Sequence, residues 1–184
     1  MTDNNLLIIL GNQLFPLEEI KKTNCKSIFI KEDFGLCTDH KHHKLKILMF
    51  LISMREYRDY LVSNGFKVIY HSIDDSEFKT PYLKTLSNEI KNNSIESIAF
   101  YQIEDNSFKN EFDKFKSKST LDFVEYDSPM FLFSKEKFRK FAESKSLRMA
   151  SFYQMMRKDL NILMDNEKPV GDQWSFDADN RKKL

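Results

Sequence analysis

The chain has few of the residues that interrupt a packed core. Its 184 residues include four glycines, four prolines and two cysteines, beside 17 phenylalanines and seven tyrosines. So few turn-forming residues and so many aromatic side chains are typical of packed helices and strands, and they exclude a low-complexity or disordered polymer. Hydrophobic residues make up 41% of a length that is usual for one domain, so we expect a substantial core and not two full domains.

The chain also has almost no net charge. Its 29 basic and 28 acidic residues leave a formal charge of +1, so no whole-molecule field draws it to nucleic acid or to an anionic membrane. The two cysteines, Cys25 and Cys37, form no CxxC pair and have no cluster of ligands beside them. This spacing argues against zinc or an iron–sulfur cluster within the chain, and we expect reduced structural thiols.

Long apolar runs and common catalytic signatures are missing as well. The N-terminal stretch MTDNNLLIILGNQ has a short apolar run with no basic segment before it, too short for a signal peptide or a membrane helix. We therefore expect a cytoplasmic protein without membrane contact. No GxxxxGK[ST] phosphate loop and no GxSxG elbow occurs, so the sequence assigns no catalytic residue.

What the sequence does contain is a regular alternation of strands and helices. Apolar and β-branched runs predict strands at 6–10, 27–31, 66–73, 95–101 and 121–126. Helical patterns at 43–63, 81–90 and 108–115 separate most of them, and two more helices at 135–144 and 150–163 precede an irregular tail at 166–184. Strands joined through helices require right-handed crossovers, so we expect an α/β fold.

The expected sheet is open, parallel and five-stranded, with strand order 3-2-1-4-5 and helices on both faces. Residues 1–133 would form this domain, and residues 134–184 a helical extension and linker. In helix 43–63 the apolar residues lie largely on one stripe, which predicts the face that packs on the sheet. This stripe consists of Leu45, Leu48, Met49, Ile52, Tyr57, Tyr60 and Leu61.

The candidate binding residues follow the first strand. Open α/β sheets bind ligands beyond the carboxyl ends of their strands, near the point where the strand order reverses. At Gly11 a backbone without a Cβ could approach a ligand closely, and the amides of Asn12 and Gln13 could read its donors and acceptors. An ordinary strand-to-helix turn is the alternative interpretation.

A second polar stretch follows the second strand. Glu32 and Asp33 come directly after it, and His42 and His43 begin the next helix. Carboxylates and imidazoles in one loop could suggest a metal site. Adjacent histidines at the start of a helix point in different directions, however, so we expect a solvated first turn and no metal ligands.

Four segments carry a family likeness. They are LIILGNQL at 7–14, HHKLKI at 42–47, GFKVIYHSIDD at 65–75 and LRMASFYQMMRKDLNILMDNEKPVGDQWSFDADNRK at 147–182. In this order they resemble the N-terminal part of the photolyase-related proteins, the prokaryotic (6-4) photolyases also called iron–sulfur bacterial cryptochromes and photolyases. Asn12 stands where that family commonly has an acidic residue, and Leu36 where some members have a polar one.

The resemblance implies a Rossmann-like antenna domain that takes part in light-dependent DNA repair. Complete members continue into a helical domain that binds FAD and a [4Fe-4S] cluster. That domain would be the partner here, absent or on a separate chain, and DNA would be contacted only through the complete protein. The family pigment is 6,7-dimethyl-8-ribityllumazine, and the resemblance places Gly11, Asn12, Gln13 and Glu32 at its pocket.

Two further functions stay open on the residues alone. The chain could be a stand-alone module that binds a small molecule or a nucleotide, because a fold can persist after a function is lost. It could also be an independent enzyme such as a hydrolase. The last possibility has the least support, since no nucleophile with a base and an orienting group can be picked out.

Overall fold

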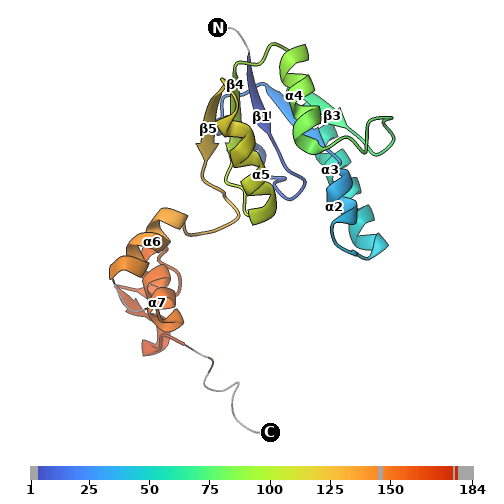
Figure 1. Ribbon diagram of the computed structural model, residues 1–184. Helices are drawn as coiled ribbons and strands as arrows, with labels where there is room; N and C mark the ends of the chain where they lie inside the picture. Colours follow the sequence, from blue (N-terminus) through green and yellow to red (C-terminus); the bar gives the residue numbers. More distant parts are fainter. Residues whose placement is uncertain (1–3, 145–146, 176, 178–184) are drawn as a thin grey trace. The chain divides into compact units, whose positions relative to one another are not determined.

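The computed structural model describes residues 4–144, 147–175 and 177, and the chain divides into two compact units (Figure 1). The first unit is Met1–Met130 and the second is Phe131–Leu184. The sequence analysis placed the boundary between the sheet domain and the helical extension between residues 133 and 134. The two units are described separately below.

The first unit contains an open parallel sheet with strand order β3-β2-β1-β4-β5, which confirms the predicted fold class. Its strands are β1 (Asn5–Ile8), β2 (Ser27–Lys31), β3 (Lys67–His71), β4 (Ser97–Tyr101) and β5 (Asp122–Tyr126). The central strands β1, β2 and β4 are buried almost throughout, as strands covered on both faces should be. Because the strands are parallel, their carboxyl ends meet at one edge of the sheet.

The first unit has five helices, α1 (Leu17–Lys22), α2 (Phe34–Thr38), α3 (Lys44–Ser63), α4 (Tyr82–Asn92) and α5 (Asn106–Ser117). Of these, α1, α3, α4 and α5 cover the two faces of this sheet, and α2 lies beyond the strand ends (Figure 1). One apolar cluster joins α1 and α3 to one face, and a second joins α4 and α5 to the other. The sequence analysis missed α1 and α2, because helices of six and five residues are too short to show a helical period.

The helix α3 ends where its local sequence predicts, but the face that packs on the sheet is not the predicted apolar stripe. Gly65 closes the helix with a φ of +86°, a conformation that glycine adopts without steric cost. On the sheet side, Leu51, Met54 and Leu61 are the buried residues of α3. Most of the predicted stripe is exposed instead, namely Leu45, Leu48, Met49, Ile52 and Tyr60.

The second unit consists of two helices and a small hairpin. Its elements are α6 (Lys135–Ser144), α7 (Met149–Asp159), β6 (Met164–Asp165), β7 (Lys168–Pro169) and a 3-10 turn at Val170–Asp172. The helix predicted at 150–163 ends at Asp159, because Asn161 and Leu163 adopt positive φ values of 51° and 52°. The Phe152 ring packs against Phe133, just before α6, and against Phe138 of α6, with ring centroids 5.3 Å apart in both pairs.

Arg157 of α7 is buried and holds the segment that follows the helix. Its guanidinium donates hydrogen bonds to the carbonyls of Ile162, Leu163, Gln173 and Trp174. The sequence analysis did not foresee the hairpin within this tail. Residues 178–184, which include the basic end Arg181-Lys182-Lys183, lie outside the described residues.

Candidate functional site

The loop after β1 approaches α2 and α3 so closely that its first residue must be small. A Cβ on Gly11 would lie 2.9 Å from the Met54 sulfur and 3.5 Å from a methyl group of Leu36. The first distance is shorter than a normal van der Waals contact, so a larger residue would displace Met54. In the structure the missing Cβ of Gly11 allows close packing of the loop against α2 and α3, whereas the sequence analysis expected it to admit a ligand.

Gln13 lies at the point where the strand order reverses, between β1 and β4. Its side-chain Nε2 donates to the Gln102 carbonyl at 2.9 Å, and its Oε1 accepts from the Leu10 amide at 3.4 Å. The residue is 1% exposed. The Nε2 bond thus joins the loops after β1 and β4, and the Oε1 bond closes the β1 loop on itself, while the neighbouring Asn12 faces solvent.

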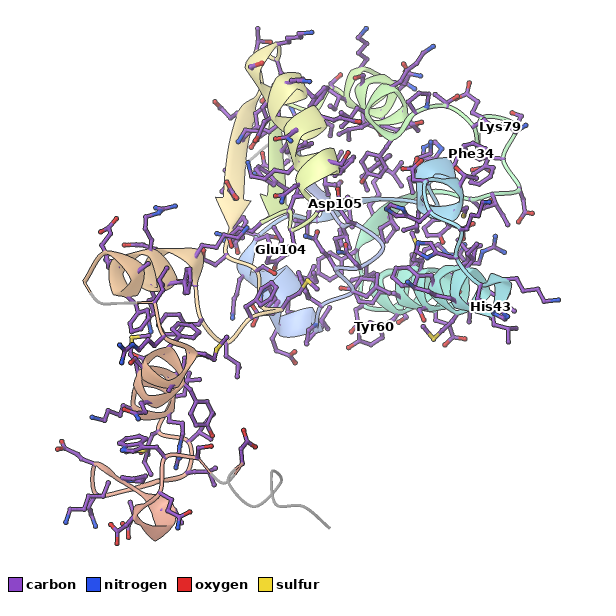
Figure 2. The ribbon with its side chains drawn as sticks, turned by 60° about the horizontal axis from the view of Figure 1, so that its bottom comes forward. Phe34, His43, Tyr60, Lys79, Glu104 and Asp105 are labelled. Carbon is purple, nitrogen blue, oxygen red and sulfur yellow. The ribbon has the colours of Figure 1, made fainter. Side chains whose placement is uncertain are left out.

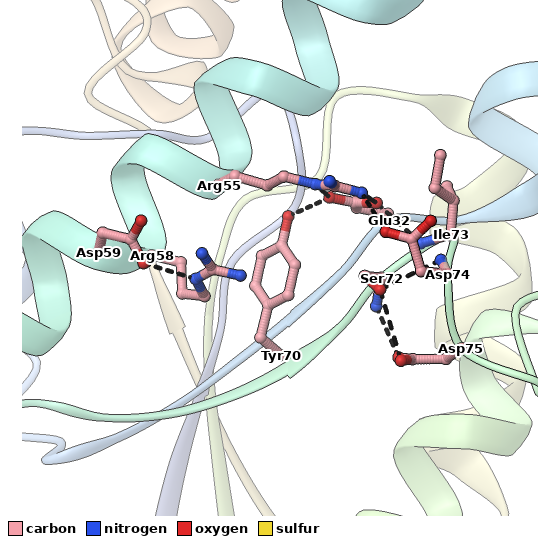
Figure 3. A network of polar contacts seen from close by, with 9 residues as sticks. All are labelled: Glu32, Arg55, Arg58, Asp59, Tyr70, Ser72, Ile73, Asp74 and Asp75. Carbon is pink, nitrogen blue, oxygen red and sulfur yellow. Dashed lines mark hydrogen bonds and ion pairs between the residues drawn. The ribbon is translucent and has the colours of Figure 1, made fainter.

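Glu32 is the centre of a polar network at the end of β2 (Figure 3). Arg55 of α3 donates from Nε to Oε1 at 2.6 Å and from Nη2 to Oε2 at 2.9 Å. The Tyr70 hydroxyl donates to Oε1 at 2.5 Å, and the Ile73 amide donates to Oε2 at 2.8 Å. With its side chain fully buried, Glu32 joins β2 to α3, β3 and the turn after β3.

These contacts determine the charge state of the network. Burial alone would raise the pKa of the Glu32 carboxyl, but the hydrogen bonds from Arg55, Tyr70 and Ile73 outweigh burial and lower it. Burial and the hydrogen bond to Glu32 raise the pKa of the Tyr70 hydroxyl. Both shifts favour an ionised carboxylate that accepts from a protonated phenol, as the hydrogen bond between them requires.

Lys31, the residue before Glu32, is positively charged, and its side chain lies on the opposite face of the sheet. Its Nζ donates to the Thr85 hydroxyl at 3.1 Å and to the Thr80 carbonyl, and it lies 3.8 Å from Asp33. Burial lowers the pKa of Lys31, although Asp33 acts in the opposite direction. The sequence analysis did not single out Lys31. An alternating strand that ends in two charged residues is the signal that could have done so.

An apolar pocket of about 90 Å³ lies between α2 and the N-terminal half of α3. Its lining residues are Leu36, His42, Lys46, Ile47, Phe50 and Leu51. Leu36 also lies against Gly11, so the pocket adjoins the loop after β1. Sites that enclose a small molecule usually measure about 300–1,000 Å³, so this pocket can receive part of such a molecule but cannot surround it.

The histidines at the start of α3 have a structural explanation. His43 is the N-cap of α3, and its Nδ1 accepts a hydrogen bond from the Leu45 amide at 3.2 Å.

In the described ranges of the chain, no group of three or more His, Cys, Asp or Glu side chains could hold a metal ion. Cys25 is buried and Cys37 is half-buried. No helix within those ranges is long and apolar enough to span a bilayer.

The residues predicted to bind a ligand thus lie at one edge of the sheet, but they do not all contact one another. Consecutive residues of α3 connect two of them, since Met54 lies against Gly11 and Arg55 binds Glu32. Gln13 is buried beside β4, and Asn12 is exposed. The pocket residues of α3 and the partner Arg55 were not predicted as site residues, because sequence alone does not show which helix face meets the loops.

The fold and this edge define a Rossmann-like α/β protein with loops that are suited to a small ligand. A family model for the deoxyribodipyrimidine photo-lyase-related proteins matches residues 7–184, and the chain belongs to this family. It is 30% identical to a (6-4) photolyase of Agrobacterium fabrum over 97% of its own length, but it spans only 36% of that relative. It is 25% identical to an uncharacterized protein of Acanthamoeba polyphaga mimivirus, over 98% of this chain and 95% of that protein.

Proposed function

We propose that this chain is a light-harvesting domain of a photolyase-like system that serves light-dependent DNA repair. It would bind 6,7-dimethyl-8-ribityllumazine beside the loops after β1 and β2. The bound pigment would absorb light for a flavin held by a second domain or a separate chain. The observation that carries this proposal is the apolar pocket next to Gly11, in a chain that belongs to the photolyase-related family.

The chemistry of the pocket suits a flat heteroaromatic ring with a polyol chain. Leu36, Ile47 and Phe50 offer apolar surface to the ring. His42 and Lys46 line the same pocket and could donate hydrogen bonds to ring carbonyls or to ribityl hydroxyls. The small volume means that part of the pigment would lie outside the pocket, where the exposed Asn12 is available.

Gln13 and Glu32 would contribute indirectly to pigment binding. Gln13 holds the loop after β1 against the carbonyl of Gln102. Glu32 holds Arg55 and the turn at Ile73. Fixed loops lower the entropy lost on binding, so both residues would preorganise the site without touching the pigment.

A titration of the purified chain with 6,7-dimethyl-8-ribityllumazine, followed by absorbance and fluorescence, tests the proposal. We expect saturable binding of the lumazine and none of FAD. Leu36→Arg should weaken binding by about tenfold or more, because it puts a charge into an apolar wall. Leu132→Arg, at an exposed leucine of the second unit, is the matched control and should leave the affinity unchanged. Absent lumazine binding would refute the antenna function, and binding that ignores Leu36→Arg would refute this location.

A stand-alone binding module is the second candidate. The observation that favours it is the viral relative, of which this chain covers 95%, so a relative of about this size exists. Tight binding of a nucleotide in the same titration, with no binding of lumazine, would support this candidate over the antenna domain. Neither candidate assigns a catalytic residue to the chain.

A further inference from the structure

The apolar pocket between α2 and α3 is too small to enclose a whole ligand. Its volume is about 90 Å³, whereas sites that enclose a small molecule measure about 300–1,000 Å³. A ring system can therefore enter the pocket fully only if one wall moves away from the other. The two walls are held very differently, and this difference indicates which of them moves.

The wall formed by α3 is anchored in the core. Leu51, Met54 and Leu61 of this helix are buried, and Arg55 is paired with the buried Glu32. Because α3 is one continuous helix of 20 residues, its first turns move together with these anchored turns. A displacement of this wall would disturb the packing on the sheet.

The wall formed by α2 has no such anchors. None of its five residues is buried, and neither apolar cluster of the first unit includes one of them. Within the ranges that the structure describes, every hydrogen bond of residues 34–38 stays between Asp33 and Asp39. Isolated helices shorter than about 12 residues are marginal in water. The position of α2 therefore depends on a few side-chain contacts, and α2 is the wall that can move.

Two side chains of α2 hold it against the rest of the unit. Leu36 lies against the loop after β1, where a Cβ on Gly11 would be 3.5 Å from a Leu36 methyl group. The Phe34 ring meets the Phe78 ring edge-on, with centroids 5.5 Å apart, and Figure 2 shows Phe34 beside Lys79. Phe34 does not line the pocket, so its contact with Phe78 can hold α2 in place without touching a ligand.

Both ends of the segment that contains α2 are fixed. Asp33 caps α2 by accepting from the Gly35 amide at 3.0 Å, and it lies 3.8 Å from the buried Lys31. At the other end, His43 caps α3. Between these two caps, residues 34–42 include no buried residue. The segment can therefore move while both of its ends stay in place.

We propose that residues 34–42 form a lid, which opens away from α3 between Asp33 and His43 to admit a ligand and then closes over it. Opening breaks the contact of Phe34 with Phe78 and lets the short helix unwind, and closure places Leu36 against the ligand. The inference rests on the proposed function for the identity of the ligand. The motion itself belongs to the ligand-free chain, so it can be measured without lumazine.

Hydrogen exchange of the full ligand-free chain, read by mass spectrometry, measures the lid opening. Amides of residues 35–39 should exchange at least about tenfold faster than those of residues 51–61 in α3. Phe34→Ala should speed exchange of residues 35–39 by about threefold to tenfold, because it removes the aromatic contact with Phe78. Phe131→Ala, at a phenylalanine of the second unit that is 56% exposed, is the matched control and should leave this exchange unchanged. Unchanged exchange of residues 51–61 in Phe34→Ala shows that the core stays intact.

Stopped-flow fluorescence with 6,7-dimethyl-8-ribityllumazine tests whether the lid admits the ligand. Phe34→Ala should speed association by the same factor as it speeds exchange, and Phe131→Ala should associate like the wild type. Exchange of residues 35–39 as slow as that of residues 51–61, or unchanged by Phe34→Ala, would overturn the lid. Association of Phe34→Ala at the wild-type rate would overturn its role in admission. Absent lumazine binding, with the exchange results as expected, would refute the antenna function and leave the lid standing.

Discussion

At the end of β2, two neighbouring residues carry opposite charges into opposite faces of the sheet. Lys31 is buried against Thr80 and Thr85, and Glu32 is buried against Arg55. A strand alternates its side chains, so two consecutive charged residues in a sheet covered on both faces must each find partners on a different face. The local sequence implies the burial of both charges, whereas the partners come from distant parts of the chain.

The pair of Arg55 with Glu32 should contribute measurably to stability. Arg55→Met leaves the buried carboxylate without two of its hydrogen bonds, and we expect a loss of about 2–3 kcal/mol at pH 7. This is below the usual cost for a buried pair, because the Arg55 side chain is 36% exposed. Urea unfolding of the wild type and the variant measures the difference.

The effect of Arg55→Met should depend on pH in one direction. The pKa of Glu32 is lowered in the folded chain from its ordinary value of 4.5, so its stabilising contribution is complete above about pH 4.5. That contribution is lost as the pH falls through the folded pKa, and the difference between wild type and variant should shrink there. Lys22→Met is the control, because Lys22 pairs with Glu19 on α1 outside this network, and it should cost less than about 1 kcal/mol. Equal losses for both variants would contradict the special role of Glu32.

At the scale of elements, α3 shows where a sequence pattern predicts a helix but not its environment. Its length and its glycine closure were predictable from residues 43–65 alone. The packing face was not, because apolar residues surround the N-terminal half and the stripe chosen from the sequence is not the one that meets the sheet. The sheet packs against Leu51, Met54 and Leu61, and most of the predicted stripe stays exposed.

The tail after α7 is a second element, and its conformation depends on one side chain outside it, that of Arg157. Its turns contain Asn161, Leu163, Asn166 and Glu167 at positive φ, which is costly for residues with a Cβ. The four carbonyl contacts of Arg157 offset this cost. The Arg157 guanidinium also lies 5.4 Å from the centre of the Trp174 ring.

Replacing Arg157 should therefore loosen this tail. Arg157→Met removes the four hydrogen bonds, and we expect a loss of about 2 kcal/mol in the second unit and Trp174 emission at longer wavelength. Trp174 is the only tryptophan of the chain, so fluorescence reports on this segment directly. Lys158→Met is the control, because Lys158 also lies over the Trp174 ring, at 5.2 Å, but holds none of the four carbonyls. An unchanged emission in Arg157→Met would contradict the role of Arg157.

At the scale of the whole molecule, the first unit contains a complete core. Both apolar clusters on the faces of the sheet consist of residues between Leu6 and Tyr126. All five strands of the large sheet lie between Asn5 and Tyr126. This unit should therefore fold without residues 131–184.

Truncation of the chain after Met130 tests this expectation. We expect far-UV circular dichroism typical of an α/β protein and a cooperative unfolding transition in urea. Truncation after Ser119 is the control. It removes β5, and with it Phe123, whose ring packs against Phe112 at 6.0 Å. The shorter chain should unfold at lower urea concentration, and a non-cooperative transition for residues 1–130 would show that the first unit needs the second.

The sequence by itself determined the strands, their order and the edge where the candidate site lies. Buried apolar runs separated by helices allow few topologies, and a parallel sheet collects its strand ends at one edge. The family likeness was also readable from the residues, and the family match over residues 7–184 confirms it.

Only the tertiary structure decided which side chains meet. Arg55 reaches Glu32 across 23 residues, and Gln13 reaches Gln102 across 89. It also decided that Gln13 is enclosed and that Leu45, Leu48, Met49 and Ile52 of α3 do not pack on the sheet. Local periodicity describes which residues share a face, whereas partners and exposure depend on how separate elements pack against one another, and no local pattern contains that information.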